Sequence, residues 1–141
     1  MSDTKRFTRR QFVRATAAAG VAVPYFVSAA ALGQAGAPGA NDKIHVGLIG
    51  CGGMGRGNLG NCAKYDDVVV TAVCDVWKER CDATLEKYKA TAKGYGDYRE
   101  LLAQKDVDAV IIASPPHWHA LMAIEACEAG KDIYLQKPMT L

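Results

Sequence analysis

Six residues, Gly50-Cys51-Gly52-Gly53-Met54-Gly55, form a G-x-G-x-x-G segment, and an acid, Asp75, follows about 25 residues later. Glycines at this spacing let the backbone turn tightly and approach a phosphate closely. A carboxylate at the end of the next strand can accept hydrogen bonds from both hydroxyls of a ribose. Taken alone, the segment is only a glycine-rich turn. It indicates nucleotide chemistry only if a strand precedes it and a helix follows it.

The apolar pattern around the glycine segment predicts those elements. Residues 44–49 form a short run rich in β-branched side chains, which is typical of a buried strand. Residues 54–65 carry apolar side chains at helical spacing, and residues 68–74 form the clearest strand of the sequence. A strand, a glycine turn, a helix and a second strand that ends in an acid together predict a dinucleotide-binding unit.

Each residue of that unit has an expected role. Gly50 allows the tight turn, Gly52 lets the backbone approach the pyrophosphate, and Gly55 lets the helix pack on the strand. Asp75 accepts hydrogen bonds from the ribose and would repel the 2′-phosphate of NADP, so we expect NAD rather than NADP. Arg56 is the counterargument, because a guanidinium could bind that phosphate. A solvated arginine in the first helical turn is the simpler interpretation.

The remaining chain continues the alternation of strands and helices. An amphipathic helix is predicted after Asp75, with an apolar stripe of Trp77, Cys81, Leu85 and Tyr88. Further along, short elements are expected at 94–96 and 98–104, a buried strand at 107–113, a helix at 120–129 that carries Leu121, Ile124 and Cys127, and a last strand at 133–135. This alternation predicts an α/β fold with a doubly wound parallel sheet.

Two later segments complete the order of motifs. They are residues 113–120 (Ala-Ser-Pro-Pro-His-Trp-His-Ala) and 130–138 (Gly-Lys-Asp-Ile-Tyr-Leu-Gln-Lys-Pro). With the glycine loop they resemble the N-terminal domain of the Gfo/Idh/MocA family, which includes glucose–fructose oxidoreductase and inositol dehydrogenase. The resemblance covers residues 43–141. It implies a Rossmann-type NAD(P)-binding domain of an oxidoreductase that transfers a hydride to or from a sugar or polyol.

The resemblance also implies site residues. The segment from Ser114 to His119 would lie along the cofactor. Lys137 would lie at the nicotinamide and substrate, where burial would let it support deprotonation of a sugar hydroxyl. The family motif usually begins with Glu where this chain has Gln136, so Lys137 lacks that charge partner. Lys137 is the single expected catalytic residue, and the expected cofactor-binding residues are Gly50, Gly52, Gly53, Met54, Gly55, Asp75, Ser114, Pro115, His119 and Lys137.

The end of the sequence at Leu141 bears on domain organisation. In the family the substrate-binding domain follows this point, so residues 41–141 are expected to be a Rossmann domain, incomplete at its C-terminus, without its substrate domain. In isolation it would expose an apolar edge. Two alternatives stay open, namely a stand-alone nucleotide-binding module and an inactive truncated product. A homo-oligomer of the full-length protein is also left open.

The first forty residues differ in composition from the rest. They carry five basic side chains against one acidic side chain, a net charge of +4 that masks a net charge of −2 in residues 41–141. Arg9-Arg10 precede an uncharged, alanine-rich stretch from Ala15 to Leu32, which is typical of a twin-arginine export signal. We expect residues 1–40 to be signal peptide and linker, the twin-arginine machinery to be a partner, and the protein to be periplasmic. An uncleaved membrane anchor and a basic amphipathic tail are the alternatives.

Composition and ligand spacing argue against several other functions. The chain after residue 40 has no basic block, so nucleic acid is not an expected partner. His117 and His119 stand two residues apart with no third ligand at a suitable spacing, so no metal site is expected. The five cysteines are odd in number and include no C-x-x-C pair, which favours free thiols.

Overall fold

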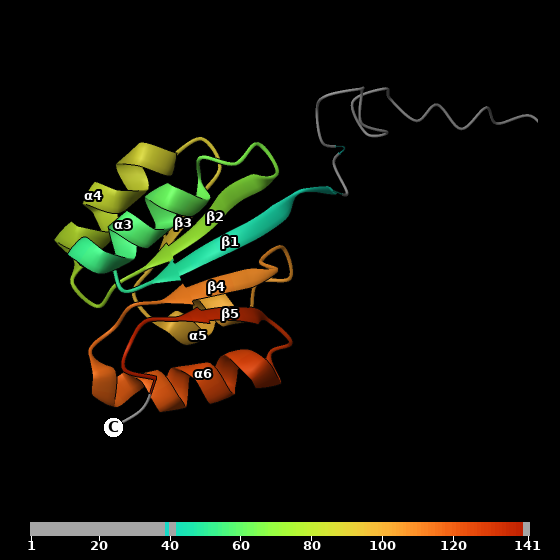
Figure 1. Cartoon of the computed structure of the whole chain (residues 1–141). Coiled ribbons are helices and arrows are strands. Elements are labelled where there is room, and N and C mark those ends of the chain that lie inside the picture. The colour runs from blue at the N-terminus through green and yellow to red at the C-terminus, as the bar shows by residue number, and fades with distance from the viewer. Residues whose placement is uncertain (1–38, 40–41, 140–141) are drawn as a thin grey trace, which may run out of the picture.

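The computed structural model describes residue 39 and residues 42–139. Apart from Gly39, the signal peptide and linker expected over 1–40 lie outside the described residues. Elements keep the labels of Figure 1, in which the first labelled helix is α3. In chain order they are β1 (Ile44–Ile49), α3 (Gly53–Cys62), β2 (Val68–Cys74), α4 (Lys78–Tyr88), β3 (Lys93–Tyr95), α5 (Tyr98–Leu102), β4 (Ala109–Ile112), the 3₁₀-helix η2 (Pro116–Trp118), α6 (His119–Glu128) and β5 (Asp132–Leu135).

The five strands form one parallel sheet in the order β3-β2-β1-β4-β5. Figure 1 shows α3 and α4 on one face and α5 and α6 on the other, so the predicted doubly wound α/β fold is confirmed. The chain runs outwards from β1 to β2 and β3, and then returns to β4 on the other side of β1. This reversal creates a crevice at the carboxyl ends of β1 and β4, where open α/β sheets bind ligands.

Strand β2 changes the face to which its side chains point. Val46 of β1 pairs with Val70, but the next residue, Gly47, pairs with Ala72, so Thr71 is an extra residue in β2. Because of this bulge, Val70 and Val73 both pack on the α3–α4 face, although strict alternation would place them on opposite faces. The apolar pattern predicted the strand but not the bulge.

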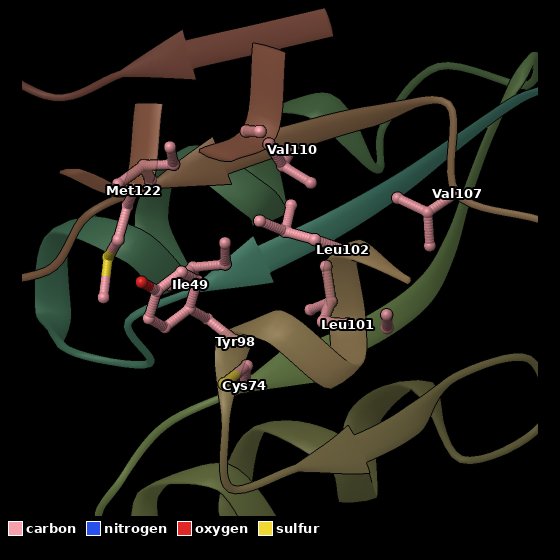
Figure 2. Packing of buried hydrophobic residues seen from close by; sticks show 11 residues of the cluster. Ile49, Cys74, Tyr98, Leu101, Leu102, Val107, Val110 and Met122 are labelled. Carbon is pink, nitrogen blue, oxygen red and sulfur yellow. The ribbon is translucent and has the colours of Figure 1, made fainter. Parts of the chain in front are cut away.

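The second face of the sheet packs against α5 and α6. Figure 2 shows Ile49 and Cys74, at the ends of β1 and β2, facing the side chains of Tyr98 and Leu101 from α5, with Met122 of α6 alongside. Leu101 and its neighbours are almost completely buried. This cluster ties α5 and α6 to the carboxyl end of the sheet and thereby holds the crevice in place.

The predicted apolar stripe of α4 is wrong at its first position. Trp77 lies just before the helix and its side chain is 54% exposed, whereas the buried residues of α4 are Cys81 and Thr84. The spacing from Trp77 to Cys81 is helical. The helix begins one residue too late to direct Trp77 towards the sheet, so the indole lies at the crevice instead of in the core.

The apolar residues that the sequence pattern indicated for α6 are exposed in the structure and do not face the sheet. Leu121 is 41% exposed, Ile124 is 57% exposed, and Cys127 is exposed. The buried residues of α6 are His119, Met122 and Ala126. This helix carries apolar side chains around most of its circumference, and only its packing against β4 and β5 decides which of them are buried.

The outer side of β5 and α6 presents apolar side chains to solvent. Strand β5 is at one edge of the sheet, and Tyr134 within it is 54% exposed. Leu121 and Ile124 of α6 are also exposed. Within the described residues, no helix is both long enough and apolar enough to cross a bilayer.

Candidate functional site

The glycine loop between β1 and α3 is shaped by two close backbone approaches. Gly50 has a φ of +96°, which L side chains rarely adopt, and its N–H donates to the Cys74 carbonyl oxygen at 2.8 Å. A Cβ on Gly55 would lie 2.0 Å from the Gly50 carbonyl oxygen, so only glycine lets α3 come this close to the end of β1. Cβ atoms on Gly52 or Gly53 would meet nothing within 4 Å, which leaves open space at the N-terminus of α3.

The Asp75 carboxylate follows β2 and is oriented by two backbone groups. Its Oδ2 accepts a hydrogen bond from the N–H of Cys51, in the glycine loop, at 2.7 Å. Its Oδ1 accepts from the N–H of Trp77 at 2.8 Å. Each oxygen keeps further acceptor capacity, so the carboxylate is held in place and can still accept from a ligand hydroxyl. The acid and the glycine loop therefore form one connected site.

A cleft of about 600 Å³ opens at this end of the sheet. Its walls come from the last residues of β1 and β2, from the segments that follow β1, β2, β3 and β4, and from α5 and α6. Both Trp77 and Trp118 line it. Arg80, Tyr98 and Met122, which the sequence pattern did not single out, also line the cleft, as does Trp77, which its helical spacing had placed in the core. Trp77 and Arg80 follow Asp75 closely in the chain, and that proximity was the available signal.

The structure brings together some of the predicted site residues in this cleft. Among the described residues, Ser114 has a buried hydroxyl that makes no hydrogen bond. A buried polar group without a partner is uncommon, and a polar ligand in the cleft would supply one. Met54 and Gly53 lie at the start of α3, and the Met54 side chain is 59% exposed. The predicted residues that line the cleft are Gly50, Gly52, Asp75, Ser114 and Pro115.

His119 has a different position from the one expected for a cofactor ligand. Its side chain is 1% exposed, with Nε2 2.8 Å from the Ser114 carbonyl oxygen and Nδ1 2.7 Å from the Pro138 carbonyl oxygen. The imidazole thus connects the end of β4 to the chain that follows β5. His117 is exposed. The part of the chain that the structure describes holds no group of three His, Cys, Asp or Glu side chains that could bind a metal ion.

Lys137 is exposed and is not among the residues that line the cleft. Its backbone N–H donates to Oε1 of Gln136 at 2.8 Å, and the Gln136 N–H donates to the Ile112 carbonyl oxygen at 2.9 Å. The burial on which its expected role in proton transfer depends is therefore not present in this part of the protein. The neighbouring Pro138 carbonyl oxygen is linked through the His119 ring to the carbonyl oxygen of Ser114, which lines the cleft.

Burial strongly affects two thiols behind the glycine loop. Desolvation raises the pKa of Cys51 to about 11 and that of Cys74 to about 12, with smaller contributions from neighbouring thiols and Asp75. All five cysteines of the chain are free in the structure. Cys51 and Cys74 are therefore neutral, unreactive packing groups around neutral pH.

We expect the melting temperature of the chain to fall by several degrees as the pH rises from 9 to 11. Unfolded thiols ionise near their ordinary pKa of 9.0, whereas folded Cys51 and Cys74 keep their protons to about pH 11 and 12. Unfolding then releases protons, so the stabilisation is complete below pH 9 and is lost above it. Thermal melts followed by circular dichroism test this. A Cys51→Ala/Cys74→Ala variant should show a shallower fall, and an equally steep fall would contradict the assignment.

The fold and the cleft define a Rossmann-type dinucleotide-binding domain. Residues 44–141 match the profile of the oxidoreductase family with an NAD-binding Rossmann fold, Gfo/Idh/MocA. The chain belongs to this family. Inositol 2-dehydrogenase of Salmonella typhimurium is 37% identical to it over 99 residues, which are 70% of this chain and 30% of the relative.

Solved structures share the fold and hold different cofactors. Myo-inositol dehydrogenase from Lactobacillus casei, in complex with NAD(H) and myo-inositol, has a TM-score of 0.66 and 31% identity, covering 70% of this chain and 29% of that one. KijD10, a 3-ketoreductase from Actinomadura kijaniata in complex with NADP, has a TM-score of 0.64 and 30% identity, covering 70% of this chain and 30% of that one. The chain spans less than a third of the length of these relatives.

Proposed function

We propose that this chain is the nucleotide-binding part of an NAD(P)-dependent oxidoreductase that moves a hydride to or from a carbon of a sugar or polyol, and that it prefers NAD. The observation that carries the proposal is the Asp75 carboxylate, fixed beside the glycine loop by two backbone N–H groups with acceptor capacity to spare. The substrate class is supported by the relatives, which include two inositol dehydrogenases.

In this proposal the protein binds and orients the cofactor and the substrate, whereas the nicotinamide, when bound, supplies the hydride chemistry. The open N-terminus of α3 receives the pyrophosphate and Asp75 accepts hydrogen bonds from the adenosine ribose. The Ser114 hydroxyl satisfies its hydrogen-bonding capacity with the cofactor. Lys137, at the surface, holds a substrate hydroxyl, and His119 acts through the backbone as a positioning residue for the segment that carries it.

Titration of the chain with NAD and with NADP tests the cofactor proposal. Trp77 and Trp118 both line the cleft, so their fluorescence reports binding directly. We expect NAD to bind more tightly than NADP, because the Asp75 carboxylate repels a 2′-phosphate. Equal or tighter binding of NADP would contradict the preference, and a lack of response to either nucleotide would contradict the site.

Replacement of Asp75 by alanine should weaken NAD binding by about 10-fold to 100-fold, the usual contribution of one or two hydrogen bonds to a charged group. The variant loses the acceptor for the ribose and also the anchor of the Cys51 and Trp77 N–H groups. Asp97→Asn is the matched control, because Asp97 also lines the cleft and Asn keeps the side-chain oxygen that caps α5. An Asp75→Ala variant with unchanged NAD affinity would exclude the ribose role.

We further propose that residues 1–40 direct the folded protein through the twin-arginine route to the periplasm. A folded fluorescent reporter fused to residues 1–40 should reach the periplasm. An Arg9→Lys/Arg10→Lys variant should remain in the cytoplasm, although its charge is the same. Export of that variant would indicate another route, and recovery of the exported reporter only in membranes would favour an uncleaved anchor.

A further inference from the structure

The imidazole of His119 lies between two backbone carbonyl oxygens and is almost completely buried. Nδ1 is 2.7 Å from the carbonyl oxygen of Pro138, and Nε2 is 2.8 Å from that of Ser114. A neutral imidazole carries one N–H donor, and its other nitrogen is an acceptor. The neutral ring therefore donates to one of the two carbonyl oxygens at a time, and the other oxygen lacks this donor.

Ser114 lies on the cleft side of this contact. It lines the cleft, and its hydroxyl is buried without a hydrogen-bond partner. Its backbone also lies against the glycine loop, because a Cβ on Gly50 would be 2.9 Å from the Ser114 nitrogen. A nucleotide bound at the glycine loop would therefore lie beside Ser114. A hydroxyl of that nucleotide can pair with the serine side chain or donate to its carbonyl oxygen, which has two lone pairs.

The Lys137 segment, residues 136–139, lies on the other side of the contact. The Gln136 N–H fixes its start by donating to the Ile112 carbonyl oxygen, and the Lys137 N–H donates to the Gln136 side chain, one residue away. Among the described residues, the contact with His119 is the one hydrogen bond that ties the rest of this segment to another element. The position of the segment therefore depends on which nitrogen of the imidazole carries the proton.

We propose that His119 makes the Lys137 segment respond to a nucleotide in the cleft. In the free protein Nε2–H donates to the Ser114 carbonyl oxygen, because water can pair with the exposed Pro138 instead. A hydroxyl of the bound nucleotide takes over the Ser114 oxygen, so the Nδ1–H tautomer is favoured, donates to Pro138 and fixes the segment. One proton leaves Nε2 and one is taken up at Nδ1, with solvent as the carrier, so the charge of the ring is unchanged. The inference rests on the proposed dinucleotide function and deepens it, because Lys137 is then placed only when the cofactor is present.

The first test locates the proton in the unmodified chain. Nitrogen NMR of the imidazole rings distinguishes the two tautomers, and spectra are recorded near pH 8, above the range in which an ordinary imidazole takes up a second proton. The chain has three histidines, and the His119 signals are those that a His119 substitution removes. We expect a proton on Nε2 without ligand and on Nδ1 with saturating NAD.

Two substitutions separate the two contacts. The side-chain nitrogen of Asn corresponds in position to Nδ1 and that of Gln to Nε2, so His119→Asn keeps the donor to Pro138 and His119→Gln keeps the donor to Ser114. In the unmodified chain NAD should slow solvent exchange of the Lys137 backbone N–H about fivefold or more. Exchange should be slow in His119→Asn and fast in His119→Gln, each with and without NAD. His117→Asn, at an exposed position, is the matched control and should respond as the unmodified chain does.

Either of two results would overturn the proposal. One is a His119 ring whose protonation is the same with and without NAD, which includes a ring protonated on both nitrogens throughout. The other is slowing of the Lys137 exchange by NAD that persists in His119→Asn or His119→Gln, since the nucleotide would then order the segment without the imidazole. Thermal melts check that the variants fold, and the NMR result on the unmodified chain decides the matter even if they do not. If NAD does not bind at all, as judged from tryptophan fluorescence, the proposed function itself fails. That outcome is distinct because the other two require binding.

Discussion

Alanine at Gly55 is expected to lower the free energy of unfolding by about 3 kcal/mol or more and to abolish nucleotide binding. The new Cβ would lie 2.0 Å from the Gly50 carbonyl oxygen and 3.2 Å from the Cβ of Ala113. The first contact is with backbone, so no side-chain rotation can relieve it. Helix α3 would have to move away from the end of β1, and its open N-terminus would move out of line with Asp75.

Gly57→Ala is the matched control, because Gly57 is in the same helix and a Cβ there meets no atom within 4 Å. Its expected effect has the opposite sign, a gain of about 0.5–1 kcal/mol, since alanine favours helix more than glycine does. Urea unfolding of both variants and NAD titration would measure the difference. If Gly55→Ala were as stable as Gly57→Ala, the close approach of α3 to β1 would be wrong.

His119→Ala should cost about 2–4 kcal/mol of stability. The imidazole is 1% exposed and holds the carbonyl oxygens of Ser114 and Pro138, so its removal leaves a cavity and two acceptors without their partner. Both partners are acceptors, and a neutral imidazole can donate to only one of them.

The exposed His117 is the natural control for His119. His117→Ala should change the free energy of unfolding by less than about 0.5 kcal/mol, because the side chain is exposed and its ring packs at a tilt beside Trp118. Urea unfolding of the two variants would measure both expected costs, and NMR of the ring N–H protons would show which imidazole nitrogens of His119 donate hydrogen bonds. Similar costs for the two variants would show that the imidazole does not hold β4 and the Lys137 segment together. NAD affinity should fall only in His119→Ala, because Ser114 borders the cleft.

Local patterns predicted much of the fold. Both central strands, at 44–49 and 68–74, have the predicted bounds, because a run of β-branched residues between polar turns has few other stable conformations. The glycine loop was equally predictable. Gly50 adopts the positive φ and Gly55 makes the close approach that this spacing requires. Family resemblance added the order of the later segments, which no single short motif would have established.

Other features depended on packing between distant segments. The pattern of α6 indicated Leu121 and Ile124, yet Met122 and Ala126 are buried, because the sheet selects one face of a helix that is apolar on several. The bulge at Thr71 has no local signature, because it exists only in the register between β2 and β1. Trp77, assigned to the core, borders the cleft because the helix begins after it.

The sequence by itself determined the class of the fold, the position of the glycine loop and the acid that faces it, since each depends on residues close together in the chain. The tertiary structure alone decided that Asp75 is anchored to Cys51, that His119 connects Ser114 to Pro138, and that Arg80 rather than Arg56 borders the cleft. These contacts join residues on separate elements. Their geometry follows from the packing of helices on the sheet, which local periodicity does not encode.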